Sequence, residues 1–127
     1  MKLLIPHSLL RSEYEPLREM VPFDILKKSA RKCLEGLGNA IKTTKKISGT
    51  ILKKVYITAP GGAARVIFLL QVSASSAVFV MIRMKNDKQI GANMTVDNKK
   101  FKKILERNLE DVLNDLAADQ YDVFDLR

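Results

Sequence analysis

The stretch ARVIFLLQVSASSAVFVMIRMK, residues 64–85, decides the fold of this chain. No charged side chain interrupts it between Arg65 and Arg83, yet this uncharged run is shorter than the ~20 apolar residues that a membrane-spanning helix needs. β-Branched residues lie on both sides of a serine-rich segment, a pattern typical of two strands joined by a turn. We therefore predict strands over Ala64–Val72 and Ala77–Lys85.

Neighbouring residues of a strand face opposite sides of the sheet, so each strand presents two sets of side chains. The even-numbered positions of both strands are apolar and are expected to face the core: Val66, Phe68, Leu70, Val72, Val78, Val80, Ile82 and Met84. The odd-numbered positions are apolar at one end and place Arg65 near Arg83 and Lys85 at the other. Pairing of even with even positions requires a connecting loop with an odd number of residues, about three or five.

The rest of the chain predicts further strands and helices. Strands are expected over Lys2–Ile5 and Ile51–Thr58, with a short edge strand over Gln89–Met94. The segment between the first strand and Gly38 is typical of a helical hairpin whose second helix begins near Pro22.

A stripe of apolar residues at 3–4 spacing from Phe101 to Leu116 predicts a long C-terminal helix, capped by Asp97 or Asn98. Apolar side chains in the tail, Gln120–Arg127, indicate that it packs as an extended segment. A chain of 127 residues suits one domain. The expected fold over 1–127 is therefore α+β, with an N-terminal helical hairpin, an antiparallel sheet of about four strands and a long C-terminal helix.

The charge of the chain is unevenly distributed. The 22 Lys and Arg outnumber the 14 Asp and Glu, which gives a formal net charge of +8. Residues 51–105 hold ten of the bases and only two of the acids, whereas residues 106–127 hold two bases and seven acids. A basic surface favours polyanions such as nucleic acid, or an acidic protein partner. The middle of the chain is therefore the expected polyanion-binding part.

Several classes of protein are disfavoured by the residue counts. The single cysteine, Cys33, allows no internal disulfide, and the single histidine, His7, gives little support for a zinc site or a Ser-His-Asp triad. We expect no metal and no other cofactor. The short apolar run at the N-terminus is followed at once by charges, which disfavours a signal peptide. A cytoplasmic protein without a membrane partner is the expectation.

Five side chains are expected on one face of the sheet. The even-numbered residues of Ile51–Thr58 join the basic face, which then contains Lys54, Tyr56, Arg65, Arg83 and Lys85. Like charges on one face repel each other and favour an anion, and arginine binds phosphate oxygens with two N–H groups. Tyr56 can stack on a base. The alternative is that these are solvated charges at strand ends.

The same side chains suit the cleavage of RNA. Attack of a 2′-hydroxyl on the neighbouring phosphate needs a base, an acid and stabilisation of the charge on the phosphorane. Cations on one face supply the stabilisation. A lysine flanked by other cations loses its proton more readily, so Lys54 or Lys85 is the candidate base.

Three stretches give the chain a resemblance to the RelE/ParE toxin superfamily of bacterial toxin–antitoxin systems. LKKVY at 52–56 and GGAARVIF at 61–68 resemble the second and third strands of the family, and RMKNDK at 83–88 resembles the end of its fourth strand. The layout of an N-terminal strand, a helical hairpin and a sheet with a basic face is also similar. The likeness covers roughly residues 1–95.

The resemblance implies a toxin that cuts messenger RNA at the ribosome without a metal and is masked by a cognate antitoxin protein. Lys53 and Lys54 match the basic pair of the second strand, and Arg65 and Arg83 match basic residues of the third and fourth. The residues implied are Lys54, Arg65, Arg83 and Lys85 for catalysis, and Lys53, Tyr56 and Lys88 for RNA binding. Two alternatives stay open: a ParE-like inhibitor of DNA gyrase that is no nuclease, and a non-catalytic RNA-binding module.

Overall fold

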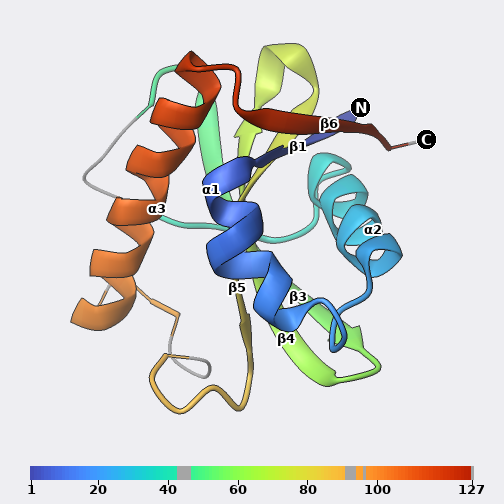
Figure 1. The fold of residues 1–127 in the computed structure, drawn as a ribbon, viewed down its shortest axis with the longest axis vertical. Coiled ribbons are helices and arrows are strands. Elements are labelled where there is room, and N and C mark those ends of the chain that lie inside the picture. Colours follow the sequence, from blue (N-terminus) through green and yellow to red (C-terminus); the bar gives the residue numbers. More distant parts are fainter. Residues whose placement is uncertain (43–46, 91–93, 96, 127) are drawn as a thin grey trace.

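The computed structural model describes residues 1–42, 47–90, 94–95 and 97–126. Its helices and strands form the expected α+β fold (Figure 1). The strands are β1 (Lys2–Pro6), β2 (Asn39–Ala40), β3 (Thr50–Ala59), β4 (Gly62–Gln71), β5 (Ser76–Met84) and β6 (Tyr121–Asp125). The helices are α1 (His7–Leu9), α2 (Phe23–Leu34) and α3 (Lys99–Ala117). The long C-terminal helix is confirmed, and Asn98 caps it by accepting hydrogen bonds from the backbone N–H groups of Lys100 and Phe101.

The sheet has six strands, in the order β2-β3-β4-β5-β1-β6. The expectation of a purely antiparallel sheet of about four strands is therefore wrong in detail. β1 runs parallel to β5, and β6 pairs antiparallel with β1 over its whole length. Pairings between the two ends of the chain are decided by tertiary packing, which the local sequence pattern does not encode.

The pairing of β4 with β5 contains a bulge. Arg65 pairs with Arg83, as expected, and Ile67 pairs with Met81, but Phe68 pairs with Phe79. Val80 is therefore the extra residue of β5, and the turn between the strands holds the four residues 72–75 rather than an odd number. Between the turn and the bulge, even positions pair with odd ones, so the expected pairing and loop length are both wrong there. The extra residue in β5 shifts the register, and even pairs with even only from the Val66–Ile82 pair onward.

The N-terminal helical segment differs from a regular hairpin. α1 is only three residues long and continues into a π-helical turn, Leu10–Tyr14, and a 3₁₀ turn, Glu15–Leu17. Pro16 lies in that last turn, where its missing N–H is tolerated. The second helix, α2, follows Pro22 as predicted. Only the second arm of the predicted hairpin is therefore regular.

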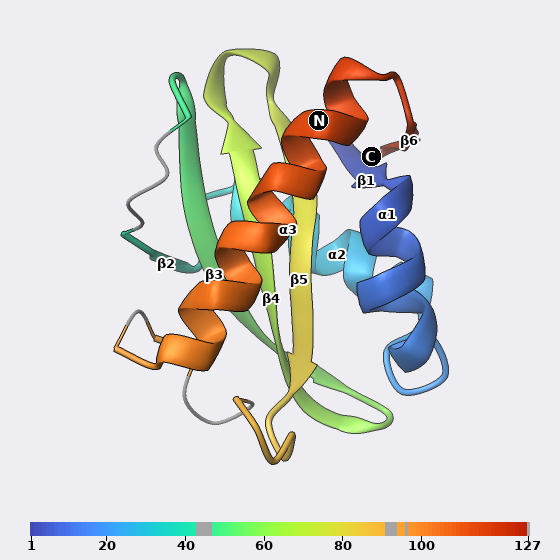
Figure 2. The same cartoon turned by 60° about the vertical axis from the view of Figure 1, so that its left-hand side comes forward.

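Helices cover both faces of the sheet. Figure 2 shows α3 in front of β4 and β5, and α2 behind them. Phe68 and Phe79, in edge-to-face contact, are fully buried, and so is Phe101 of α3. The buried Asn108 of α3 donates a hydrogen bond of 3.1 Å to the carbonyl oxygen of Val80. The helix therefore provides a partner for the backbone at the bulge.

Two segments near the C-terminus were predicted with different success. The extended tail is confirmed as β6, whose Phe124 packs on Phe23 with ring centroids 4.7 Å apart. The short edge strand over Gln89–Met94 is wrong for the part described, because residues 88–90 form a turn and Met94 is a buried residue outside any strand. Residues 91–93 of that prediction lie outside the described residues.

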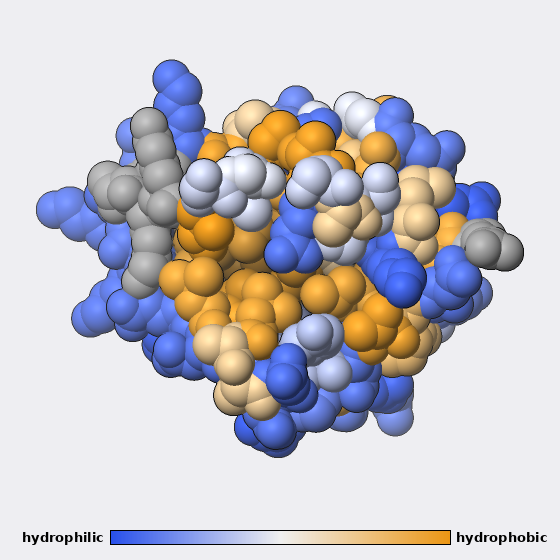
Figure 3. Space-filling view, turned by 90° about the horizontal axis from the view of Figure 1, so that it is seen from above, coloured by the Kyte–Doolittle hydropathy of each residue, from blue (hydrophilic) through white to orange (hydrophobic). Residues whose placement is uncertain are grey.

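The two ends of the sheet differ in polarity. Figure 3 looks down on the end that carries the turn between β4 and β5, and hydrophobic residues gather in the middle of this surface. Val72, in that turn, is 60% exposed. Within the described residues, no helix is long and apolar enough to span a membrane. The basic strand ends lie at the other end of the sheet, beside the hairpin of β3 and β4.

Candidate functional site

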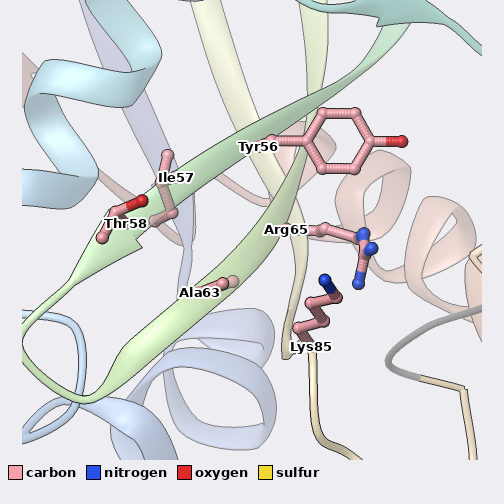
Figure 4. A pocket seen from close by; sticks show the side chains of 7 residues that line it. Tyr56, Ile57, Thr58, Ala63, Arg65 and Lys85 are labelled. Atoms are coloured by element: carbon pink, nitrogen blue, oxygen red, sulfur yellow. The ribbon is translucent and has the colours of Figure 1, made fainter.

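A pocket of about 250 Å³ lies where β3 and β4 approach their hairpin. Its lining consists of Tyr56, Ile57, Thr58, Ala63, Ala64, Arg65 and Lys85. Figure 4 shows the side chains of Arg65 and Lys85 reaching into the same space, with the ring of Tyr56 beyond them. Three of the residues predicted from the sequence are therefore brought together.

The register of the sheet places these residues. Tyr56 is the partner of Arg65, and Arg65 is also the partner of Arg83, so the three lie in one row across β3, β4 and β5. Residues that pair directly share a face of the sheet. Lys85 follows β5, where its backbone N–H bonds to the carbonyl of Ala63 at 2.8 Å. The pocket therefore depends on the β4–β5 register that the sequence predicted.

The hairpin that carries the pocket is docked on the N-terminal segment. The N–H of Gly61 donates to the carbonyl of Met20 at 3.0 Å. A Cβ on Gly61 would lie 2.4 Å from the Cβ of Met20. Only glycine allows this approach, so the hairpin sequence Pro60-Gly61-Gly62 fixes the position of the strands that line the pocket.

Tyr56 is the exposed aromatic side chain of the site. Its ring lies 5.1 Å from the Arg65 guanidinium and 5.5 Å from the Lys54 ammonium. Partial desolvation raises the pKa of the phenol, but hydrogen bonding and attraction from Lys54 and Arg65 outweigh it, so the pKa is lowered from 10.0. Two cations therefore favour the phenolate.

Lys54 has a partner inside the molecule. Only 9% of the residue is exposed, and its Nζ donates a hydrogen bond of 2.9 Å to the carbonyl oxygen of Met94. Met94 belongs to the connection between β5 and α3 and is itself buried. Lys54 thus tethers that connection to β3 while its charge acts on Tyr56. Because its Nζ is bonded to a carbonyl inside the protein, Lys54 is less accessible to a substrate hydroxyl than the sequence indicated.

Arg83 also has an internal partner. Its Nη1 donates to Oε1 of Glu13 and to the carbonyl oxygen of Ile82. The Arg83 side chain is 20% exposed and that of Glu13 is 2% exposed. Although Arg83 lies opposite Arg65 in the register, it does not belong to the lining of the pocket. Its predicted position on the sheet is confirmed, but its charge is already paired.

The other two predicted RNA-binding residues lie elsewhere. Lys53 points to the opposite face of the sheet from Lys54, because strand neighbours alternate, and its Nζ approaches the carbonyl of Gly36 at 3.4 Å. Lys88 is exposed in the turn after β5. The structure therefore separates Lys53 from the pocket, whereas Lys88 is accessible.

Glu13 is the residue that the sequence analysis missed. A signal was present, because Leu9 and Glu13 are four residues apart and share one side of a helical segment. Leu9 is fully buried, so a carboxylate at that spacing is expected to be buried with it. A buried carboxylate requires a partner, and a nearby cation is the natural candidate.

Cys33 and His7 have structural surroundings. Cys33 is buried, as expected for a core residue, and desolvation raises the pKa of its thiol to about 11. His7 Nε2 lies 3.1 Å from Oδ1 of Asp122 in β6. In the part of the chain that the structure describes, no group of three or more His, Cys, Asp or Glu side chains is placed to hold a metal ion.

Comparisons of the chain with models of protein families, with curated proteins and with solved structures found no match. An arginine, a lysine and an exposed tyrosine at one pocket can bind a phosphate group, stack against a base and exchange a proton.

Proposed function

We propose that this protein binds single-stranded RNA at the Tyr56–Arg65–Lys85 pocket and cuts it, as the toxin of a RelE-like system in the cytoplasm. The observation that carries the proposal is the convergence of two cations on one open pocket beside a tyrosine with a lowered pKa. A phosphodiester is the anion that combines a single negative charge with a neighbouring base for Tyr56 to contact.

Each of the three side chains has a role in the proposed reaction. The Tyr56 phenolate takes the proton from the 2′-hydroxyl, whose oxygen then attacks the adjacent phosphorus. Arg65 stabilises the negative charge of the phosphorane with its N–H donors. Lys85 gives a proton to the 5′-oxygen as the P–O5′ bond breaks. The products are a 2′,3′-cyclic phosphate and a free 5′-hydroxyl.

A second candidate is a module that binds RNA without cutting it. The internal partners of Lys54 and Arg83 favour this function, since both side chains bond to oxygen atoms of the protein outside the lining of the pocket. The surface charge and Tyr56 suit binding in both cases. If the protein is a toxin, an acidic or amphipathic antitoxin would be the natural partner of the basic pocket.

Primer extension on a messenger RNA tests the proposal. Purified protein is added to a reconstituted translation reaction, and in parallel to the same RNA without ribosomes. The toxin function predicts new RNA 5′ ends that require ribosomes and are lost with Arg65→Gln. Lys27→Gln on α2 is the matched control, because it removes one positive charge on the opposite side of the sheet and is expected to leave the cuts unchanged.

The other outcomes have distinct meanings. Cuts in RNA without ribosomes would support a nuclease that does not require the ribosome. Binding without cuts, weakened by Arg65→Gln, supports the binding module. Neither cuts nor binding, from folded protein, contradicts both candidates and leaves inhibition of gyrase as the function to test.

A further inference from the structure

The outer edge of β5 is covered by two side chains instead of a strand. The pairing of β1 with β5 ends at Leu4 and Val78. Beyond that point, Ile82 forms a pair with Val66 in which the backbone groups of Ile82 point away from β4. Oε1 of Glu13 accepts the Ile82 N–H at 3.0 Å, and Nη1 of Arg83 donates to the Ile82 carbonyl at 2.7 Å. The pair therefore satisfies both backbone groups of one residue.

The guanidinium of Arg83 is bonded at the edge of β5, where its Nη1 donates to Glu13 and to the Ile82 carbonyl. Arg83 shares a face with Arg65, its direct partner in the ladder. Two like charges at directly opposed positions destabilise a sheet. Glu13 draws the guanidinium to the strand edge and neutralises it there. The pocket is left with Arg65 and Lys85 as the cations in its lining.

We propose that Glu13 is a positioning residue that holds Arg83 at the edge of β5. It thereby limits the number of cations that contact a bound phosphate. This inference rests on the proposed function, because the phosphate is that of the bound RNA. Removal of the Glu13 charge releases Arg83 toward Arg65 and adds a third cation to the site. The wild-type pocket thus matches a singly charged phosphodiester, and the released form suits a more highly charged anion.

Binding of a fluorescent single-stranded RNA to four proteins tests this assignment. The proteins are wild type, Glu13→Gln, Arg83→Gln and the double variant. The amide introduced by Glu13→Gln retains an oxygen that can accept the Ile82 N–H. Glu15→Gln is the matched control, because it adds the same net charge two residues away and affects only the exposed pair of Glu15 with Arg18.

The expected results form a thermodynamic cycle. Glu13→Gln tightens Kd about threefold, the gain from one added surface contact, and steepens the slope of log K against log salt by about 0.7. Arg83→Gln in the wild-type background leaves Kd within about twofold. The double variant returns to the wild-type value, since the gain depends on Arg83. Glu15→Gln leaves both Kd and the slope unchanged.

Three results would overturn the assignment. Arg83→Gln that weakens binding tenfold in a protein of wild-type stability would place Arg83 on the RNA. Glu13→Gln without any gain would mean that Arg83 stays at the edge without the carboxylate. A gain of equal size from Glu15→Gln would attribute the effect to net charge alone.

Side-chain ¹⁵N NMR of arginine in the wild-type protein provides a test that requires no stable variant at Glu13. The Nη signals of Arg83 are expected to be split by restricted rotation and to stay in place when RNA or inorganic pyrophosphate is added, while those of Arg65 move. Averaged Arg83 signals in the free protein contradict the role of Glu13. Failure of wild-type protein to bind RNA contradicts the proposed function instead, and the free-protein spectrum still tests Glu13.

Discussion

Two pairs of cations lie on or next to β3, β4 and β5, and their surroundings differ. Arg65 and Lys85 line the pocket, whereas Lys54 and Arg83 lie outside its lining, where Lys54 bonds to Met94 and Arg83 to Glu13. All four residues follow from one alternating pattern in the sequence. The difference arises from segments that are remote in sequence, the connection before α3 and the helical turn after β1. An alternating pattern of basic residues therefore predicts which cations share a face of the sheet. It does not predict which of them contact a ligand.

The largest expected effect separates the two arginines. Arg65→Gln removes stabilisation of the phosphorane and is expected to lower the rate of RNA cleavage about 10³-fold, the upper range for loss of one such donor. Arg83→Gln is expected to change it less than about threefold, because its charge is already paired. Single-turnover cleavage assays on both variants, with circular dichroism as the folding control, make this comparison. Equal losses of cleavage rate in both variants would contradict the distinction between the two pairs of cations.

The sequence predicted the parts of this site that depend on local alternation. The opposition of Arg65 and Arg83, and the placing of Lys54 and Tyr56 on one strand face, follow from a period of two. It could not predict the β5 bulge, because an added residue leaves the hydrophobic pattern nearly intact when both faces of the sheet are buried. Nor could it predict the Glu13–Arg83 pair, which joins residues 70 positions apart.

Glu13→Ala removes the carboxylate of the buried Glu13–Arg83 pair. The change leaves the Ile82 N–H and a mostly buried guanidinium without their carboxylate, so we expect a loss of about 3 kcal/mol in the free energy of unfolding. Urea denaturation measures this loss. Glu15→Ala, which removes an exposed partner of Arg18, is the control and is expected to lower it by less than about 1 kcal/mol. A loss no larger for Glu13 than for Glu15 would show that the buried pair does not stabilise the fold.

Tyr56→Phe tests whether the phenol of Tyr56 acts as the base within the pocket. The pKa of Tyr56 lies below 10.0 because Lys54 and Arg65 favour the phenolate. A reaction that uses the phenolate as base speeds up as pH rises toward that pKa and becomes level above it. We expect Tyr56→Phe to lose about 10²-fold in rate and to lack this rising limb. Rates measured between pH 6 and about pH 10 test it, and an unchanged profile in the variant would assign the base to another residue.

The smallest expected effect concerns Lys54. Lys54→Met keeps the buried stem but removes the hydrogen bond to Met94, so the free energy of unfolding is expected to fall by about 1 kcal/mol. RNA affinity is expected to stay within about twofold, because the ammonium contacts the protein. Urea denaturation and fluorescence anisotropy measure the two quantities. RNA binding that is tenfold weaker at unchanged stability would show that Lys54 is one of the cations that bind the RNA.

Photo-cross-linking tests the central claim most directly. A single-stranded RNA containing 4-thiouridine is irradiated with the wild-type protein, and the modified tryptic peptide is identified by mass spectrometry. We expect modification of Val55–Arg65, the peptide between the cleavage sites after Lys54 and Arg65, at Tyr56. Cross-links confined to peptides of α2, on the opposite side of the sheet, would contradict it.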